Sequence, residues 1–236
     1  MGIPTVNDKF KACRGLLLDF GGTLDTDGDH WLDRFYDLYE SAGIDIPRVD
    51  IKRVFYYADD TLYGDQEVFS LGLRPLMRRH VKLQFEALDM ENAAWEEHLI
   101  DGFCSRTEFF LRRNVSLLDR LKDRYRLGVV SNFYGNVAAL CEEAGIARFF
   151  DVILDSARVG KMKPDPAIFQ MAVEALRVGP EETIFVGDSY ERDMMPARKA
   201  GMKTVWMKGP NPRIPQNPEP VDCCITSLAE LGTLLL

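Results

Sequence analysis

Short, continuously apolar runs recur along most of the chain. Such runs predict strands that are buried on both faces, and they occur at about 15–18, 127–130, 152–154, 183–186, 204–206 and 223–225. Helical patterns separate them, at roughly 136–144, 165–177, 191–200 and 227–235. Pro166 fits a first helical turn, and Gly145, Gly179 and Gly201 fall where helices are expected to end. This alternation predicts an α/β fold with a parallel sheet and right-handed crossovers.

The stretch 30–112 breaks the alternation, because it contains helical patterns and no comparable strand run. One pattern includes Trp31 and Phe35, and further helices are expected at about 50–60, 73–89 and 92–111. We therefore expect a helical insertion after the first strand. Its aromatic residues, Trp31 among them, are more typical of internal packing than of a ligand cage.

Three of the predicted strands end at polar residues. Asp19 follows the first, Ser131 and Asn132 follow the second, and Asp188 follows the fourth, with Asp193 five residues further on. Because the carboxyl ends of parallel strands lie along one edge, these residues should meet in one crevice. Turn formation would explain any one of them, but it explains the whole set less well.

The charges in this crevice predict a divalent cation. Asp19, Asp188 and Asp193 contribute −3, and one nearby lysine would leave −2. Carboxylates that lie close together raise one another's pKa unless a cation intervenes. Mg²⁺ prefers oxygen ligands, would bring the sum to zero, and would admit a phosphate that the acidic cluster alone would repel.

Four short motifs occur in order: Asp19-Phe20-Gly21-Gly22-Thr23-Leu24, Val130-Ser131-Asn132, Lys163-Pro164-Asp165-Pro166 and Gly187-Asp188-Ser189-(x3)-Asp193. Their order and spacing resemble the haloacid dehalogenase superfamily, in the subclass with a helical cap between the first two motifs. The resemblance covers about 14–230. It implies a Rossmann-like core formed by 1–27 and 113–236, and a helical cap formed by 28–112.

The resemblance also implies a role for each motif residue. Asp19 is expected to be the nucleophile that forms an aspartyl-phosphate. The expected Mg²⁺ ligands are Asp19, the backbone carbonyl of Gly21, Asp188 and Asp193, with the alternative that Asp193 holds a metal-bound water and the lysine. Phosphoryl oxygens are expected to be bound by Thr23, Ser131 and backbone N–H groups, including that of Asn132, and Gly22 and Asn132 are the expected substrate-binding positions. Lys163 is expected to neutralise both nucleophile and phosphate.

The chain departs from the family pattern at Gly21, where most phosphatases of the family carry an aspartate that protonates the leaving group. General acid–base catalysis contributes typically ~10²–10⁴-fold, so the loss matters without abolishing activity. Four interpretations stay open. In the first, the substrate is an acyl or aryl phosphate, whose leaving group needs little protonation. In the second, a residue near the cap entrance replaces the acid: Asp25, Asp27, Asp29 or His30. Each of these four, taken singly, fits a polar, flexible hinge.

The third interpretation is a phosphonatase-like enzyme, which would use a cap lysine. The fourth is a 2-haloacid dehalogenase, which needs neither a metal nor a leaving-group acid. A non-enzymatic phospho-ligand-binding protein ranks below these, because Asp19, Lys163 and Asp188 are all present. The intact pair Asp188 and Asp193 favours phosphoryl transfer, so we expect a Mg²⁺-dependent phosphohydrolase acting on a small phosphorylated metabolite.

Composition adds limits on partners and compartment. The 236 residues carry a net charge of −8, which argues against a general affinity for nucleic acid or an acidic membrane. Five irregularly spaced cysteines fit reduced thiols, and the polar N-terminus lacks the apolar segment of a leader, so a cytoplasmic protein is expected. The three histidines have no zinc-binding spacing, and Arg78-Arg79-His80 reads as a solvated helix face. The oligomeric state stays open.

Overall fold

A computed structural model describes residues 8–236 and contains a six-stranded parallel sheet. The strands are β1 (Gly15–Leu18), β2 (Arg126–Ser131), β3 (Val152–Asp155), β4 (Thr183–Gly187), β5 (Lys203–Met207) and β6 (Cys223–Ile225). Their order in the sheet is β3-β2-β1-β4-β5-β6, and every neighbouring pair is parallel. All six predicted strands and the α/β class are confirmed. The N-terminal stretch that lacks a leader pattern begins with residues 1–7, which lie outside the described part.

The continuous apolar run of β1 is explained by its burial on both faces. Successive side chains of a strand point to opposite faces. Leu16 and Leu18 enter one apolar cluster, whereas Leu17 enters the other together with Phe169 and Phe185. Both faces of β1 are therefore covered, and its four residues are all buried.

The helices of the sheet-containing half are α5 (Val137–Glu143), α6 (Ser156–Val159), α7 (Pro166–Leu176), α8 (Met195–Lys199) and α9 (Leu231–Leu235). Pro166 begins α7 as expected, and Gly145 and Gly201 take positive φ after helix ends. The expectation for Gly179 is wrong: α7 ends at Leu176, and the capping residue Arg177 itself adopts φ 53°. The predicted helix at 191–200 is a single π turn, Tyr190–Met194, followed by the short α8.

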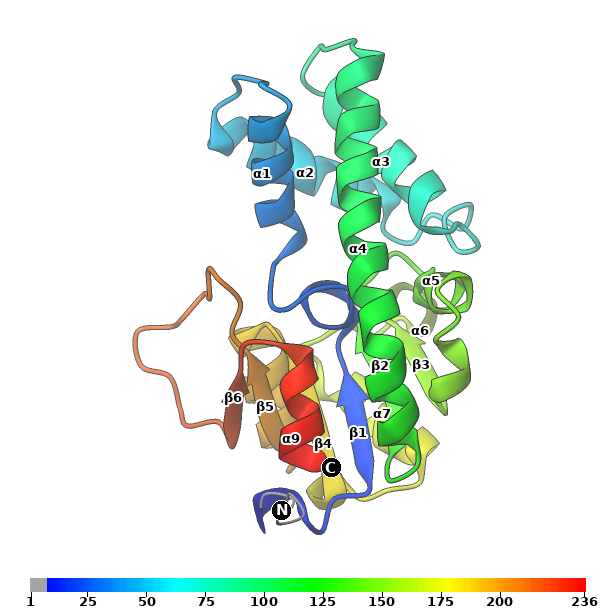
Figure 1. Ribbon diagram of the computed structural model, residues 1–236, viewed down its shortest axis with the longest axis vertical. Helices are drawn as coiled ribbons and strands as arrows, with labels where there is room; N and C mark the ends of the chain where they lie inside the picture. The colour runs from blue at the N-terminus through cyan, green and yellow to red at the C-terminus, as the bar shows by residue number, and fades with distance from the viewer. Residues whose placement is uncertain (1–7) are drawn as a thin grey trace.

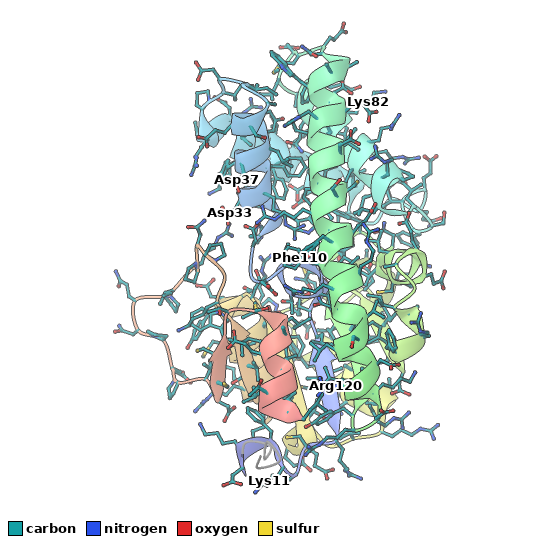
Figure 2. All side chains as sticks on the ribbon, viewed as in Figure 1. Lys11, Asp33, Asp37, Lys82, Phe110 and Arg120 are labelled. Carbon is teal, nitrogen blue, oxygen red and sulfur yellow. The ribbon has the colours of Figure 1, made fainter. Side chains whose placement is uncertain are left out.

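The other half of the molecule is built from α1 (Trp31–Ser41), α2 (Arg48–Leu62), α3 (Leu73–Glu86) and α4 (Ala93–Lys122). Figure 1 shows these helices stacked above the sheet, with α4 running from their outer end down beside β2 and α9. Phe110 lies midway along this helix and Arg120 lies beside α9 (Figure 2). The helix that was expected to end near 111 thus continues without a break to Lys122, and one apolar cluster extends from the sheet into the helical half.

The segment between β1 and α1 is a buried polar network. Asp25 is fully buried, and its carboxylate accepts hydrogen bonds from Gly22 N (2.7 Å), Trp31 Nε1 (2.6 Å) and Arg34 Nη2 (2.7 Å). Asp27 pairs with Arg113 of α4 at 2.6 Å. The expected flexible polar hinge is therefore wrong here, because these carboxylates hold the turn after β1 against α1 and α4.

We predict that Asp25→Asn lowers the free energy of unfolding by about 3 kcal/mol, because Arg34 would keep a buried charge without its main partner. Urea unfolding followed by circular dichroism measures the loss. Glu108→Gln is the matched control: it removes the acid from an exposed pair with Arg112 and should cost less than about 0.5 kcal/mol. Equal, small losses in both variants would contradict a structural role for the Asp25–Arg34 pair.

No helix within residues 8–236 combines the length and the apolar character needed to cross a membrane. Within the same residues, all five cysteines are free thiols, as the sequence led us to expect.

Candidate active site

The carboxyl edge of the sheet brings the motif residues together. β1 ends directly at Asp19, and the backbone then makes a tight π turn over Phe20–Leu24. Gly22 takes φ 80° in this turn, and a Cβ there would lie 2.5 Å from Asp188 Oδ2. A glycine is required at this position both by the backbone conformation and by the close approach of the Asp188 carboxylate, which directly follows β4.

Asp19 is held by three donors that converge on one carboxylate oxygen. Its Oδ1 accepts hydrogen bonds from Phe20 N (2.7 Å) and Ser131 Oγ (2.8 Å), and lies 2.9 Å from Lys163 Nζ. No donor among the described residues is hydrogen-bonded to Oδ2. The carboxylate is thus fixed in orientation while one oxygen stays available for chemistry.

Lys163 is buried between two carboxylates. Its Nζ lies 2.9 Å from Asp19 Oδ1 and 2.7 Å from Asp193 Oδ1. Burial by itself disfavours the ammonium, but the two carboxylates outweigh burial and raise the pKa of Lys163. The lysine therefore stays charged and neutralises part of the acidic crevice.

Asn132 positions this lysine through the backbone. Its Oδ1 accepts from Lys163 N at 2.7 Å, and its Nδ2 donates to Lys163 O at 2.8 Å. Asn132 uses one N–H donor and its carbonyl oxygen to hold the backbone of Lys163. Its side chain thus clamps the loop that carries Lys163 and fixes the lysine relative to β2.

Asp19, Asp188 and Asp193 each offer a carboxylate oxygen within 4.8 Å of the others. Burial is the main cause that raises the pKa of Asp188 well above its usual range, and neighbouring Asp193 and Asp19 raise it further. Burial likewise raises the pKa of Asp193, although Lys163 opposes the shift. Three hard oxygen donors that repel one another in this way fit a small divalent cation such as Mg²⁺.

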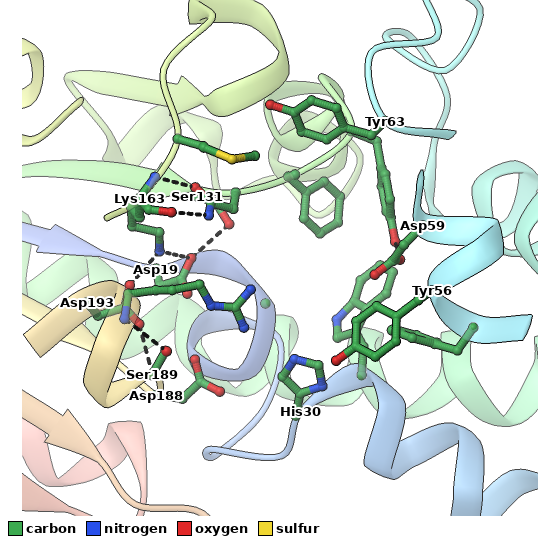
Figure 3. A pocket seen from close by; sticks show the side chains of 18 of the residues that line it. Asp19, His30, Tyr56, Asp59, Tyr63, Ser131, Lys163, Asp188, Ser189 and Asp193 are labelled. Atoms are coloured by element: carbon green, nitrogen blue, oxygen red, sulfur yellow. Dashed lines mark hydrogen bonds and ion pairs between the residues drawn. The ribbon is translucent and has the colours of Figure 1, made fainter. Parts of the chain in front are cut away.

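A cavity of about 440 Å³ opens over these residues and reaches the helical half. Asp19, Gly21, Ser131, Lys163, Asp188 and Asp193 lie on the sheet side, whereas His30, Tyr56, Asp59 and Tyr63 face them from the helical side (Figure 3). Trp31 also lines the cavity while it packs against Phe103 and Phe133, so its packing and lining roles coincide.

Two predicted site residues lie outside the cavity lining. Thr23 is fully buried, and its hydroxyl has no hydrogen-bond partner among the described residues. Gly22 lies in the turn after β1, where a Cβ would collide with the carboxylate of Asp188. The cavity is instead lined by Ser189 and Arg192, which sequence reasoning did not select. Ser189 is part of the last motif and Arg192 lies in its three-residue spacer, and that position is the only signal that could have found them.

The structure separates the four candidates for the missing acid. Asp25 is enclosed with Arg34, Asp27 is paired with Arg113, and Asp29 Oδ2 lies 2.8 Å from Arg106. Only His30 of these four lines the cavity.

His30 Nδ1 accepts the hydrogen bond of Leu32 N, so the neutral ring carries its proton on Nε2. Burial is the largest cause that lowers the pKa of His30 to about 3. Near neutral pH, His30 can therefore offer a hydrogen bond, but it is not an imidazolium acid.

Open parallel sheets bind their ligands in the crevice at the carboxyl edge of the sheet, and in this protein three carboxylates line that crevice. The model of the haloacid dehalogenase-like hydrolases matches residues 13–201. The chain therefore belongs to this family, and the resemblance inferred from the four motifs is confirmed.

Related proteins include known phosphatases. Glyceraldehyde 3-phosphate phosphatase of Pyrococcus abyssi is 36% identical over 196 residues, which cover 67% of this chain and 82% of that protein. Phosphoserine phosphatase of Thermus thermophilus is 45% identical, but the match covers 31% of this chain and 30% of that protein. Haloacid dehalogenase-like hydrolase domain-containing protein 3 of Bos taurus is 40% identical over 38% of this chain and 36% of its own length.

Solved structures agree on the fold. The HAD-hydrolase YfnB of Bacillus subtilis, described as bound to magnesium, has a TM-score of 0.57 and 20% identity over 95% of this chain and 99% of its own. A dehalogenase with an intermediate complex has a TM-score of 0.62 and 20% identity over 95% and 97%. At this level of identity the likeness concerns the fold alone.

We predict that Asp188→Asn stabilises the chelator-treated protein at pH 7.5. The pKa of Asp188 is higher in the folded protein than the value of 3.8 in the unfolded chain. Its ionisation therefore destabilises the folded protein as the pH rises from 3.8 toward the folded-state pKa, and asparagine avoids this loss because it does not ionise. The gain should exceed the roughly 0.5 kcal/mol of an ordinary surface substitution and vanish as the pH falls toward 4. Urea unfolding across this pH range measures it; a gain independent of pH would contradict the electrostatic cause.

Proposed function

We propose that this chain is a Mg²⁺-dependent phosphohydrolase that acts on a small phosphorylated metabolite through an aspartyl-phosphate at Asp19. The observation that carries the proposal is the buried ammonium of Lys163 between Asp19 and Asp193, beside the third carboxylate of Asp188. A fixed nucleophile, a fixed cation and a set of oxygen ligands then share one cavity.

In this mechanism one carboxylate oxygen of Asp19 attacks phosphorus, and the bond from phosphorus to the leaving oxygen breaks. Oδ2 is the oxygen without a donor, so it is the atom free to react. Ser131 and Lys163 already donate toward the same carboxylate, and they are placed to bind the oxygens of the transferring group. Water then hydrolyses the acyl phosphate, which releases phosphate and restores Asp19.

Mg²⁺ would be held by Asp19, the carbonyl of Gly21, Asp188 and Asp193. When bound, it supplies positive charge that offsets the −2 left by three carboxylates and one lysine, and so allows a phosphate dianion to enter. The raised pKa values of Asp188 and Asp193 support this assignment, since both groups lack sufficient compensating charge without a cation.

The proposal also gives separate roles to the sheet-containing half and the helical half of the molecule. Residues 1–27 and 113–236 would form the catalytic core, and 28–112 would form a cap that covers the substrate and limits the access of water to Asp19. We also propose a cytoplasmic location, where phosphorylated metabolites are available.

Dehalogenation is the alternative reaction for an aspartate nucleophile in this family. It needs no metal, so it gives no reason for the converging carboxylates of Asp188 and Asp193. Release of halide from 2-chloropropionate in the presence of a chelator would favour this alternative over phosphate hydrolysis.

We predict that Asp19→Asn lowers kcat/KM for p-nitrophenyl phosphate by at least about 10³-fold, because the amide cannot form the covalent intermediate. Steady-state release of p-nitrophenol measures the loss, and circular dichroism checks the fold. Asp37→Asn, at an exposed carboxylate of α1, is the control and should keep full activity. Retained turnover in Asp19→Asn would eliminate the covalent route.

Gly21 should make alkyl phosphates slow substrates relative to aryl phosphates, and we predict that Gly21→Asp narrows this gap. Position 21 has φ −70°, and a Cβ there meets no heavy atom closer than 3.7 Å, so a side chain fits. We expect kcat/KM for n-butyl phosphate to rise at least tenfold, toward the ~10²–10⁴ typical of a general acid. Gly21→Asn is the size-matched control without an acid. An unchanged rate in a correctly folded Gly21→Asp protein would place the acid elsewhere.

A further inference from the structure

The helical side of the active-site cavity is aromatic and acidic. Among the residues that line the cavity, Phe55, Tyr56, Asp59 and Tyr63 come from α2 and the residue that follows it. The lysine and arginine of the lining, Lys163 and Arg192, both come from the sheet-containing half. A leaving group that points away from Asp19 therefore meets aromatic faces and negative charge.

Asp59 is the most strongly organised of these residues. Its Oδ1 accepts hydrogen bonds from the hydroxyl of Tyr134 and from His80 Nε2, the latter at 3.2 Å. Within the described residues, Oδ2 accepts no hydrogen bond, and no lysine or arginine lies within 4 Å of the carboxylate. The side chain is 27% exposed, and Figure 3 shows it across the cavity from Asp19.

A buried chain of hydrogen bonds stands behind this carboxylate. Tyr39 hydroxyl donates to Gln84 Oε1 at 3.2 Å, and Gln84 Nε2 lies 2.7 Å from His80 Nδ1. Because a carboxylate only accepts, His80 Nε2 carries the proton toward Asp59, and Nδ1 accepts from the amide. Each donor of the chain is then matched to an acceptor.

Such a chain is costly in an apolar interior unless it is fully satisfied. Tyr39, His80 and Gln84 are all completely buried, so His80 does not lie on the solvated face that the sequence predicted. Its ring stacks on Phe35 at 5.2 Å between centroids. The chain runs through the core of the helical half and ends at Asp59, where it holds one carboxylate oxygen and leaves the other toward the cavity.

We propose that Asp59 is a specificity-determining residue that binds a positively charged nitrogen on the leaving group of the substrate. The substrate class is then a phosphomonoester whose leaving group carries an amine on an apolar or aromatic stem. Aromatic faces attract cations and pack against such a stem. A second phosphate or a carboxylate at the same place would face Asp59 and Asp60 and be repelled. This inference rests on the proposed phosphohydrolase function.

Three aryl phosphates of similar size test the assignment: 4-(aminomethyl)phenyl phosphate, 4-ethylphenyl phosphate and 4-(carboxymethyl)phenyl phosphate. Since one well-placed charge pair gives about tenfold in affinity, we expect kcat/KM for the amine to exceed that for the ethyl compound about tenfold, mainly through KM. The carboxylate should be the poorest substrate. Equal rates, or a preference for the carboxylate, would overturn the proposal.

Asp59→Asn keeps an acceptor oxygen for Tyr134 and His80 but removes the charge. We expect its preference for the amine over the ethyl compound to fall to within about threefold, because only the charge-dependent part of binding is lost. Asp50→Asn removes one charge from the exposed start of the same helix, outside the cavity, and should keep the wild-type preference. An Asp59→Asn protein that retains the full preference would overturn the role of Asp59.

Binding without hydrolysis separates this proposal from the proposed function. Calorimetry on the wild-type protein should show tighter binding of 4-hydroxybenzylamine than of 4-ethylphenol, and Asp59→Asn should remove the difference. If the protein hydrolyses none of the three phosphates, the phosphohydrolase function fails, and this comparison alone decides the amine site. Equal binding of the two phenols would then reject it.

Discussion

The ammonium of Lys163 is the interaction on which the active site depends. It lies buried between Asp19 and Asp193, and neither carboxylate could be enclosed so closely without it. The remaining charge of the cluster is still negative, because Asp188 joins the same three-carboxylate group. The geometry therefore leaves a net negative charge, which one further cation would neutralise.

Several features of the fold serve this one arrangement. A Cβ at Gly22 would collide with Asp188, and one at Gly187 would lie 2.4 Å from Asp193 Oδ2, so both glycines let a carboxylate approach the backbone. Asn132 fixes the lysine loop to the end of β2 through two backbone hydrogen bonds. The parallel sheet places the motif residues along one edge, and hydrogen bonds and ion pairs then hold their side chains together.

The helical half is held to the turn after Asp19 by a second buried charge pair, Asp25 and Arg34. Asp25 accepts from Gly22 N in the turn after Asp19 and from Trp31 and Arg34 of α1. Asp25 thus connects the backbone beside Asp19 with α1, whose Trp31 lines the cavity. This connection explains why the acidic stretch after β1, although it lies near the active site, contributes little free acid to it: its carboxylates are already paired.

The sequence by itself determined the sheet, the helical insertion and the cluster of motif residues, because strands buried on both faces and polar residues at strand ends leave patterns that need no partner to be read. It could not show that His80 is buried or that Asp59 faces Asp19. His80 directly follows two arginines along the chain, whereas its hydrogen-bond partners are Gln84, one turn later, and Asp59 on another helix. Nor could it distinguish His30 from Asp25, since adjacent polar residues look alike until packing buries one and leaves the other at a cavity. Those distinctions depend on contacts between distant segments, and only the tertiary structure decides them.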